Sequence, residues 1–418
     1  MAPVITYQDI LDARTRIAGA VMQTPCQKSP QLSTLTQMKM WCKLEFLQHT
    51  GSFKERGACN ALEQLAPSAR KRGVIAASAG NHALALAYHG MRLGISVTVV
   101  MPIFAPLIKI STCRNFQANV ILHGKTFGEA VEQAHMIGKD ENRTYIHGFD
   151  DPPIIAGQGT TGLEILEQVP EVEAVVVPIG GAGLIAGIAL AIKTQRPDVQ
   201  VIGVEAENAC CYWDALEAGH PVPIHAKPTL ADGLAVHTVG HNAFKIAREH
   251  VDRVVLVNEA ELSLAILRLV EREKSVVEGA GAAGLAACLA GKLPELHSKN
   301  VVLCLCGGNI DPSILSRVIE VGLAADGRLM RFTARISDRP GGLAEFTKVI
   351  AQTGASIKDI THDRTFAGPD VSAVHVVCQV ETSDHDHIDR VFQTLEKHHI
   401  PYRAIETDNS FIESTCSN

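Results

Sequence analysis

Residues 174–184, with the sequence AVVVPIGGAGL, show the pattern that decides the fold of most of this chain. A run of consecutive apolar residues ends in a glycine-rich turn, and the turn leads into the helix-like stretch Leu184–Gln195. The same order recurs at residues 74–93, where VIAA is followed by SAGNH and a second helix-like stretch. Strands that are apolar at consecutive positions are covered on both faces. The pattern therefore predicts strand–turn–helix units in parallel sheets.

Strand-like and helix-like segments alternate in this way from about residue 73 to residue 322. This order predicts an α/β fold with helices on both sides of each sheet. The predicted strands are Val74–Ala77, Val97–Met101, Asn119–Leu122, Ala174–Ile179, Val199–Val204, Arg253–Val257 and Asn300–Leu305, and two of the predicted helices are His82–Leu93 and Leu184–Gln195.

The pattern changes near Ala325-Asp326-Gly327, which reads as a short linker. The segments after it follow the order βαββαβ, which is the ferredoxin-like arrangement, so we expect a domain boundary between roughly residues 322 and 330. The expected elements are strand Arg331–Ile336, helix Gly341–Thr353, strands Ser356–Asp363 and Val371–Val380, helix His385–His398 and a short strand near Tyr402.

The composition is that of a globular protein with a sizeable core. Of 418 residues, 46% are hydrophobic and 20% are charged, and the formal net charge of −7 gives no support for nucleic-acid binding. We expect neither a signal peptide nor a membrane span, because the N-terminus has no apolar segment and no uninterrupted apolar run reaches roughly 18 residues. Eleven cysteines without a disulfide framework spacing fit buried thiols in a reducing compartment, so we expect a cytoplasmic protein.

Three turns that follow predicted strands carry residues suited to ligand binding. They are SAGNH at residues 78–82, IGGAGL at 179–184 and CGGN at 306–309. Ligands of open α/β sheets bind at the carboxyl ends of the strands, and backbone N–H groups at a helix N-terminus suit a carboxylate or a phosphate. Each turn alone could be an ordinary connection, and Cys306 could be a buried thiol. Three such turns in one fold favour a shared site.

A lysine follows small and polar residues in the segment Thr50-Gly51-Ser52-Phe53-Lys54. A lysine that forms a Schiff base must be neutral when it attacks an aldehyde, and burial or the positive end of a helix lowers its pKa. Lys54 is therefore a candidate nucleophile, although an arbitrary lysine is most often a solvated surface residue.

Together these segments resemble the β-family, or fold type II, of pyridoxal 5′-phosphate enzymes. The resemblance covers about residues 5–322 and is strongest to threonine dehydratases of the biodegradative kind and to their serine dehydratase and serine racemase relatives. It implies an α/β catalytic domain over residues 1–325 with two parallel-sheet subdomains, the smaller of which, about residues 48–150, is inserted in the larger. The motifs, in chain order, are SFKERGA, SAGNHA, IAGQGTTGLEI, VPIGGAGLIAG, LADGLAV, VEGAGAAG and CGGNID.

The resemblance implies a role for each matching residue. Lys54 would hold the cofactor as a Schiff base and remove the substrate α-proton, and Phe53 would pack beside the pyridine ring. Asn81 would hydrogen-bond the ring hydroxyl, and Cys306 would lie at the pyridine nitrogen. The phosphate would be bound by Gly180, Gly181, Ala182, Gly183 and Leu184, and the substrate by Thr50, Ser52, Ser78, Asn81 and His82.

The implied reaction is the dehydration and deamination of L-threonine to 2-oxobutanoate and ammonia, and of L-serine to pyruvate and ammonia. Racemase members carry a serine directly before Gly-Asn-His as a second acid/base. This chain has Ala79 there, which cannot transfer a proton, so a lyase is favoured. Racemase activity and another β-hydroxy amino acid substrate, such as 3-hydroxyaspartate, stay open. The non-enzyme alternative is a catalytically weakened amino-acid sensor.

Three positions depart from the family's pattern. Ala182 stands where a glycine is usual, and a positive φ there would strain it by about 1 kcal/mol or more. Gly148 replaces a usual proline. Glu205 matches one ligand of a divalent-cation site found in relatives, but Cys211 replaces the aspartate, so a monovalent ion at Glu205 is the remaining possibility.

The C-terminal segment resembles an ACT domain, which we expect over residues 330–406, on the stretches DRPGGLA at 338–344 and ASIKDI at 355–360. Such domains often bind an amino-acid effector at a dimer interface, which places the contact near Gly341 and Gly342. A domain that serves only oligomerisation is the alternative, and we expect a homodimer or a homotetramer. The histidines of this segment show no convincing metal-ligand spacing.

Overall fold

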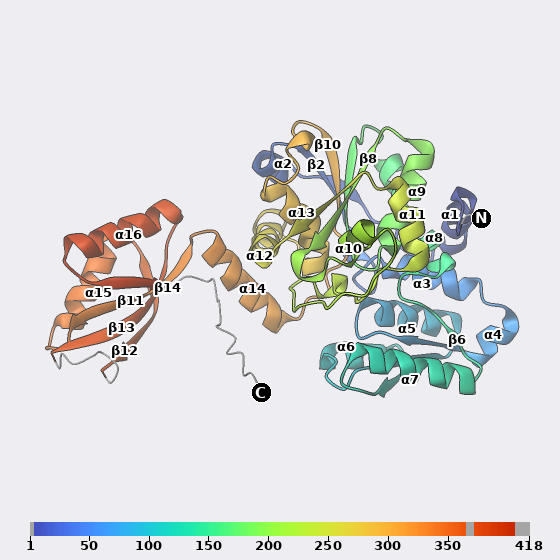
Figure 1. Cartoon of the computed structure of the whole chain (residues 1–418), viewed down its shortest axis with the longest axis horizontal. Helices are drawn as coiled ribbons and strands as arrows, with labels where there is room; N and C mark the ends of the chain where they lie inside the picture. The colour runs from blue at the N-terminus through green and yellow to red at the C-terminus, as the bar shows by residue number, and fades with distance from the viewer. Residues whose placement is uncertain (1–3, 365–371, 406–418) are drawn as a thin grey trace. The chain divides into compact units, whose positions relative to one another are not determined.

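The chain divides into two units, Met1–Pro312 and Ser313–Asn418, in a computed structural model that describes residues 4–364 and 372–405 (Figure 1). The division lies one helix earlier than the predicted boundary at residues 322–330. Helix α14 (Pro312–Ala325) falls almost wholly in the second unit, and its Glu320 forms an ion pair of 2.7 Å with Lys358 of the same unit.

The larger sheet of the first unit has six strands in the order β1-β2-β10-β7-β8-β9. Only β1 runs antiparallel to its neighbour, and the remaining pairs are parallel, as the continuous apolar runs predict. The strands are β1 (Cys26–Lys28), β2 (Lys39–Lys43), β7 (Ala174–Pro178), β8 (Gln200–Ala206), β9 (Arg253–Val257) and β10 (Asn300–Cys304).

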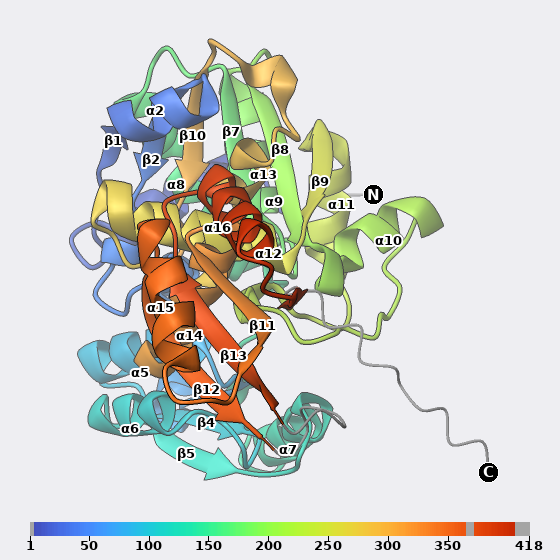
Figure 2. The same cartoon turned by 90° about the vertical axis from the view of Figure 1, so that its left-hand side faces the viewer.

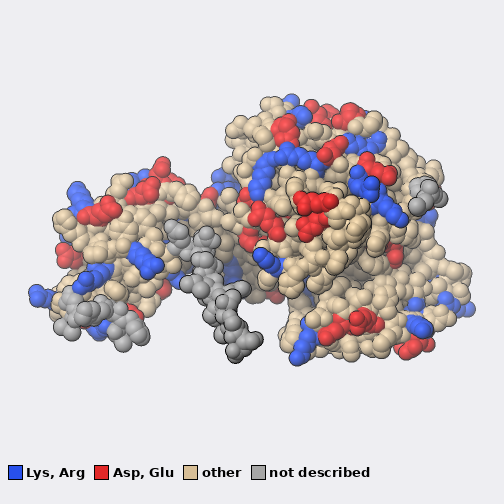
Figure 3. Space-filling view, in the orientation of Figure 1, with Lys and Arg blue, Asp and Glu red and all other residues tan. Residues whose placement is uncertain are grey.

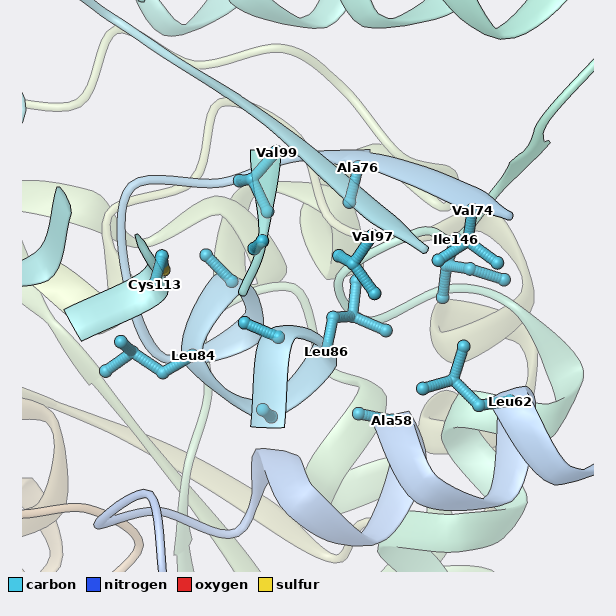
Figure 4. Close-up of a cluster of buried hydrophobic side chains, with 14 of the residues drawn as sticks. Ala58, Leu62, Val74, Ala76, Leu84, Leu86, Val97, Val99, Cys113 and Ile146 are labelled. Atoms are coloured by element: carbon cyan, nitrogen blue, oxygen red, sulfur yellow. The ribbon is translucent and has the colours of Figure 1, made fainter. Parts of the chain in front are cut away.

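The smaller sheet has four parallel strands in the order β5-β4-β3-β6, which are β3 (Val74–Ala77), β4 (Val97–Met101), β5 (Asn119–Leu122) and β6 (Thr144–Tyr145). Alternate residues of β3 face two separate clusters of apolar side chains. Val74 and Ala76 join the cluster in Figure 4, and Ile75 and Ala77 pack on the other side, against Ala130 and Ala134 of α7 (Phe127–Asp140). Both faces of the sheet are therefore buried, and this requires the unbroken apolar sequence.

The other helices of the first unit connect and cover these two sheets. They are α1 (Tyr7–Ile17), α2 (Pro30–Thr36), α3 (Lys54–Glu63), α4 (Pro67–Arg72), α5 (Asn81–Leu93), α6 (Leu107–Asn115), α8 (Pro152–Gln168), α9 (Gly183–Gln195), α10 (Cys211–Ala218), α11 (His241–His250), α12 (Glu259–Arg268) and α13 (Gly279–Leu289). The α/β class and the seven predicted strands are confirmed within one or two residues at each end. Strands β1, β2 and β6 were not predicted, because they are short and carry polar residues at several positions.

The second unit has the predicted order βαββαβ. Its elements are β11 (Leu329–Ser337), α15 (Gly342–Gln352), β12 (Ser356–Asp363), β13 (Ala373–Glu381), α16 (His385–Lys397) and β14 (Tyr402–Ile405). The strands form an antiparallel sheet in the order β12-β13-β11-β14. Every second residue of β13 is buried, and these residues form one core with side chains of α15 and α16. Figure 2 shows the ribbons of these two helices and of the strands. Residues 365–371 and 406 of the predicted domain lie outside the described residues.

Among the described residues, no helix is long and apolar enough to cross a membrane. On the face drawn in Figure 3, lysine and arginine side chains are interspersed with aspartate and glutamate side chains. This face has no extended basic area of the kind that binds nucleic acid.

Candidate active site

Lys54 is the first residue of α3, and the loop before it is held against the end of β10. The Phe53 N–H donates to the Cys306 carbonyl at 3.0 Å, and the Gly308 N–H donates to the Gly51 carbonyl at 2.9 Å. Gly51 has a φ of +77°, where a side chain would also collide with Asn309. The lysine motif and the CGGN motif, about 250 residues apart in the sequence, therefore form one structure.

Lys54 is partly buried, and its amine lies beside the segment that contains Gly148. Its Nζ donates a hydrogen bond of 2.6 Å to the Gly148 carbonyl and lies 5.1 Å and 5.9 Å from the ring centroids of Phe53 and Phe149. Burial lowers the pKa of Lys54 from 10.5 to about 8, because the charged form loses its hydration. A substantial fraction of the amine is therefore neutral, and nucleophilic, near neutral pH.

Asn81, at the start of α5, belongs to a chain of hydrogen bonds across the site. Its Nδ2 donates to Glu278 Oε1 at 2.7 Å, and its Oδ1 accepts from Asn309 Nδ2 at 2.9 Å. The same Asn309 nitrogen donates to the Thr50 carbonyl at 2.7 Å. The chain ties three turns together: the lysine loop, SAGNH and CGGN.

Glu278 was missed as a site residue by the sequence reasoning, although it lies in the quoted motif VEGAGAAG. Its side chain is buried, and burial raises its pKa from 4.5 to about 7. The available signal was a carboxylate next to a run of small and apolar residues, where a charge is costly unless it has a partner. That partner is Asn81.

The turn at residues 180–183 leads from β7 into α9. No side chain among the described residues caps α9, so the first-turn N–H groups of the helix are free to bind an anion. Ala182 has a φ of +68° and a ψ of −2°, so the alanine in this left-handed conformation carries the strain that was expected for a positive φ. A side chain at Gly181 or Gly183 would overlap Phe149, which brings the turn next to the Lys54 segment.

His82 contributes a neutral side chain. Its Nε2 lies 3.1 Å from the Ile146 carbonyl, which can only accept, so Nε2 carries the proton. Burial lowers the pKa of His82 to about 3, and its Nδ1 has no hydrogen-bond partner in the described part of the chain. The side chain therefore cannot donate to a carboxylate through Nδ1. The expectation that His82 belongs to the substrate-binding residues stays a prediction, and the N–H groups at the start of α5 are the donors that suit a carboxylate there.

Two buried hydroxyl groups face no protein partner. Thr50 Oγ1 and Ser52 Oγ are buried and have no hydrogen bond to any of the described residues. Ser78 is different, because its Oγ accepts the Gly80 N–H at 3.2 Å and so shapes the turn before α5. Buried polar groups are rarely left unpaired, so the two free hydroxyls indicate a ligand.

Cys306 and Glu205 are both buried, and burial raises the pKa of each. The pKa of the Cys306 thiol lies well above its usual value of 9.0, so the thiol is neutral. The pKa of Glu205 rises to about 8, and its two oxygens accept the N–H groups of Tyr212 and Trp213 at 2.8 Å each. Cys211 Sγ donates to the Gly180 carbonyl at 3.5 Å. In residues 4–364 and 372–405 no three side chains form a metal-binding group.

The structure thus brings together several of the residues that the sequence assigned to the site in the first unit. The loop of residues 50–54 pairs with the backbone at Cys306, and Asn81 donates a hydrogen bond to Glu278 beside it. The turn at 180–184 packs against Phe149, which lies next to Lys54. Gly341 and Gly342 lie in the second unit, at the start of α15.

The fold and this site define the class of protein. The family model described as pyridoxal-phosphate dependent enzyme matches residues 17–307, and the chain belongs to this family. The chain is 43% identical to the L-threonine ammonia-lyase of Thermotoga maritima over 392 residues, which are 94% of this chain and 97% of the relative. It is 42% identical to the catabolic L-threonine dehydratase of Escherichia coli K12 over 318 residues, 76% of this chain and 96% of that protein.

Among solved structures, the processed form of threonine deaminase isoform 2 from Solanum lycopersicum matches with a TM-score of 0.73 and 36% identity, over 75% of this chain and 92% of that chain. About three quarters of this chain aligns with almost the whole E. coli relative. The alignment to the T. maritima relative covers 94% of this chain, so it must include most of the second unit. The second unit is therefore an addition that only some relatives share.

The residues of the site fit pyridoxal phosphate. A buried amine with a lowered pKa suits the aldehyde, the uncapped start of α9 suits the phosphate, and a neutral thiol at Cys306 can lie at the pyridine nitrogen without forming an ion pair. Two unpaired hydroxyls and the N-terminus of α5 remain for a substrate carboxylate.

Gly183→Ala should weaken phosphate binding and destabilise the protein. The new methyl group would overlap the backbone carbonyl of Phe149, which cannot turn away as a side chain could, so we expect a loss of about 1–3 kcal/mol or more. The measurements are the free energy of unfolding and the dissociation constant of pyridoxal phosphate. Ala182→Gly is the matched control. It relieves left-handed strain of about 1 kcal/mol but removes a buried methyl and adds chain entropy, so its net effect should be near zero.

Proposed function

We propose that this enzyme deaminates L-threonine to 2-oxobutanoate and L-serine to pyruvate, each with release of ammonia, with pyridoxal phosphate held on Lys54. The observation that carries the proposal is the buried amine of Lys54, whose pKa is about 8, among two unpaired hydroxyls and two uncapped helix N-termini. The names of the relatives from T. maritima and E. coli support threonine as the substrate.

In this proposal, different residues of the chain remove the α-proton and bind the substrate carboxylate. When bound, pyridoxal phosphate supplies an aldehyde carbon for the substrate amine and a ring that withdraws electrons from the substrate Cα. The neutral Lys54 amine removes the α-proton, and the Gly148 carbonyl, 2.6 Å from Nζ, orients the amine while it is free. Thr50 Oγ1, Ser52 Oγ and the first N–H groups of α5 bind the substrate carboxylate.

Two further residues favour elimination over racemisation. The neutral Cys306 thiol would not hold a proton on the ring nitrogen of a bound cofactor, and this would favour elimination, in which the β-hydroxyl and the proton taken by Lys54 leave together as water. Ala79, which is apolar, cannot return a proton on the opposite face of the substrate.

The test is the formation of 2-oxo acid from L-threonine and from L-serine by the purified holoenzyme, with D-serine measured in the same samples. Turnover of both substrates without D-serine is expected. Accumulation of D-serine would favour a racemase. Absence of product from both substrates, with the visible absorbance of the bound cofactor intact, would reject the proposal and direct attention to 3-hydroxyaspartate and to ligand sensing.

For the rest of the chain we propose an ACT-like role of the second unit, with an amino-acid effector near Gly341 and Gly342 in a cytoplasmic homodimer or homotetramer. Support comes from Gly341, which has a φ of +98° and leads into α15 with open space where a side chain would stand. A monovalent cation at Glu205 would share the carboxylate with the N–H groups of Tyr212 and Trp213. Titration calorimetry with each proteinogenic amino acid tests for the effector. Sedimentation tests the oligomeric state, and its comparison between potassium and tetramethylammonium salts tests the cation.

The rate of cofactor uptake should report the lowered pKa of Lys54. Only the neutral amine attacks an aldehyde, so uptake by the cofactor-free protein should rise about tenfold per pH unit and level off above about pH 8. The measurement is the appearance of visible absorbance after pyridoxal phosphate is added at each pH. A free lysine derivative serves as the control, and its rate should still rise toward about pH 10. A protein rate that climbs in parallel with the control would contradict the prediction.

A further inference from the structure

Hydrogen bonds hold the backbone at Thr50 and Gly51, and one of them is accepted by a buried carboxylate. The Gly51 N–H donates to the Gln48 carbonyl at 2.8 Å, and the Thr50 carbonyl accepts from Asn309 at 2.7 Å. The Thr50 N–H donates to Glu55 Oε1. The N–H and the carbonyl of Thr50 are therefore both hydrogen-bonded, whereas its hydroxyl has no hydrogen bond to the described residues.

Glu55 follows Lys54 on α3 and is fully buried. Its second oxygen, Oε2, has no hydrogen bond within the described ranges, and His89 Nε2 of α5 lies 3.5 Å from it. His89 is also fully buried, and its Nδ1 accepts from Arg92 Nε at 3.3 Å. The proton of a neutral His89 is therefore on Nε2, the nitrogen next to the carboxylate.

His89 is held in turn by its neighbour on α5. Arg92, whose side chain is about one third exposed, donates to His89 Nδ1. His89 adjoins Glu55, and Glu55 accepts from Thr50. The other groups near His89 are the ring of Tyr88, with centroids 4.9 Å apart, and His49.

A buried carboxylate is costly, and a simpler residue could occupy this position. An acidic group in the first turn of a helix stabilises the helix by up to about 1 kcal/mol, which is a purely structural role. However, Glu55 does not bind its own helix alone. Its bond to Thr50 fixes a residue whose hydroxyl, like that of Ser52, has no hydrogen-bond partner in the described part of the chain. The geometry thus connects the carboxylate to two buried hydroxyls that the proposed function assigns to the substrate carboxylate.

We propose that Glu55 is a positioning residue for substrate binding, which sets the hydroxyls of Thr50 and Ser52 by accepting the Thr50 N–H. The proposal rests on the proposed function, because it takes these hydroxyls as contacts for a substrate carboxylate. It concerns the binding of amino acids that carry an α-carboxylate, and not the transfer of the α-proton. The expected effect of its loss is therefore on KM and much less on kcat.

The experiment compares Glu55→Leu, Glu55→Gln and the control Glu63→Leu in the holoenzyme. Glu63 is the last residue of the same helix, and its bonds are to Arg70 and Arg92 near the surface. Glu55→Leu should raise KM for threonine and serine by about tenfold, the scale of one lost hydrogen bond to a charged group, with kcat within about threefold of the parent. Glu55→Gln keeps an oxygen for the Thr50 N–H and should recover most of the affinity.

A second readout separates this proposal from the proposed function. L-alanine has the amine and the carboxylate but no leaving group, and its binding to the holoenzyme is followed by the change in visible absorbance. Its dissociation constant should rise about tenfold in Glu55→Leu and little in Glu63→Leu, whether or not threonine is turned over. The proposal is overturned if Glu55→Leu weakens L-alanine no more than Glu63→Leu does. If Glu55→Leu does not fold, Glu55→Met, which also removes the acceptor of the Thr50 N–H, is compared with Glu63→Met by the same constant, and equal constants overturn the proposal.

Discussion

Lys54→Ala is expected to abolish the formation of 2-oxo acid from L-threonine, with kcat reduced by at least about 10³-fold. The buried amine is the group of the site that can both attack an aldehyde and take the α-proton, and alanine can do neither. We expect the variant to lose the visible absorbance of covalently held pyridoxal phosphate as well. The measurements are the rate of 2-oxo acid formation and the absorbance spectrum of the same sample.

The control for this prediction is Lys125→Ala, which removes an exposed lysine of the smaller sheet's surface. It should leave both the rate and the spectrum unchanged. A Lys54→Ala protein that still turned over threonine at more than about one per cent of the parent rate would move the chemistry to another residue. Retention of the visible band in that variant would show that the cofactor is held elsewhere.

The lysine and the three glycine-containing turns could be predicted because their signals are local. An apolar run followed by AGN or GGAG predicts a strand, a turn and a helix start from adjacent residues alone, and the strand ends of parallel sheets meet at one edge. Ala182 shows the limit of such reasoning. The sequence could state what a positive φ would cost, and only the backbone shows that φ is +68°.

The parts that could not be predicted depend on contacts between distant segments. Asn81 and Glu278 are bonded across 197 positions, and the Gly148 carbonyl meets Lys54 across 94 positions. No periodicity encodes these pairings. The division after Pro312 differs from the predicted boundary for a similar reason, because α14 begins at Pro312 and only its packing assigns the helix to the second unit.

Arg56→Met is expected to lower the free energy of unfolding by about 3–5 kcal/mol, the cost of leaving buried charges without their partner. Arg56 lies two residues after Lys54 and is fully buried. Its guanidinium donates to Glu45 at 2.7 and 2.8 Å and to Glu164 at 2.6 Å. Burial alone would raise the pKa of Glu45, but Arg56 and Lys43 outweigh it, and the pKa is lowered. The measurement is denaturant unfolding at neutral pH.

The matched control is Arg14→Met, which breaks an ion pair between Arg14 and Glu167. Glu167 lies on α8, the helix that also carries Glu164, and both side chains of this pair are about half exposed. Exposed pairs contribute roughly 0–1 kcal/mol, so this variant should stay within that range. Glu45 also makes the stability of the fold depend on pH. A carboxylate with a lowered pKa stabilises the fold above its unfolded pKa, near 4.5, and loses that contribution as pH falls. The parent should therefore lose stability below about pH 4.5 more steeply than Arg56→Met, in which Glu45 is already protonated at higher pH. Equal losses for Arg56→Met and Arg14→Met would mean that the network beneath Lys54 is solvated, and that α3 is held by apolar packing alone.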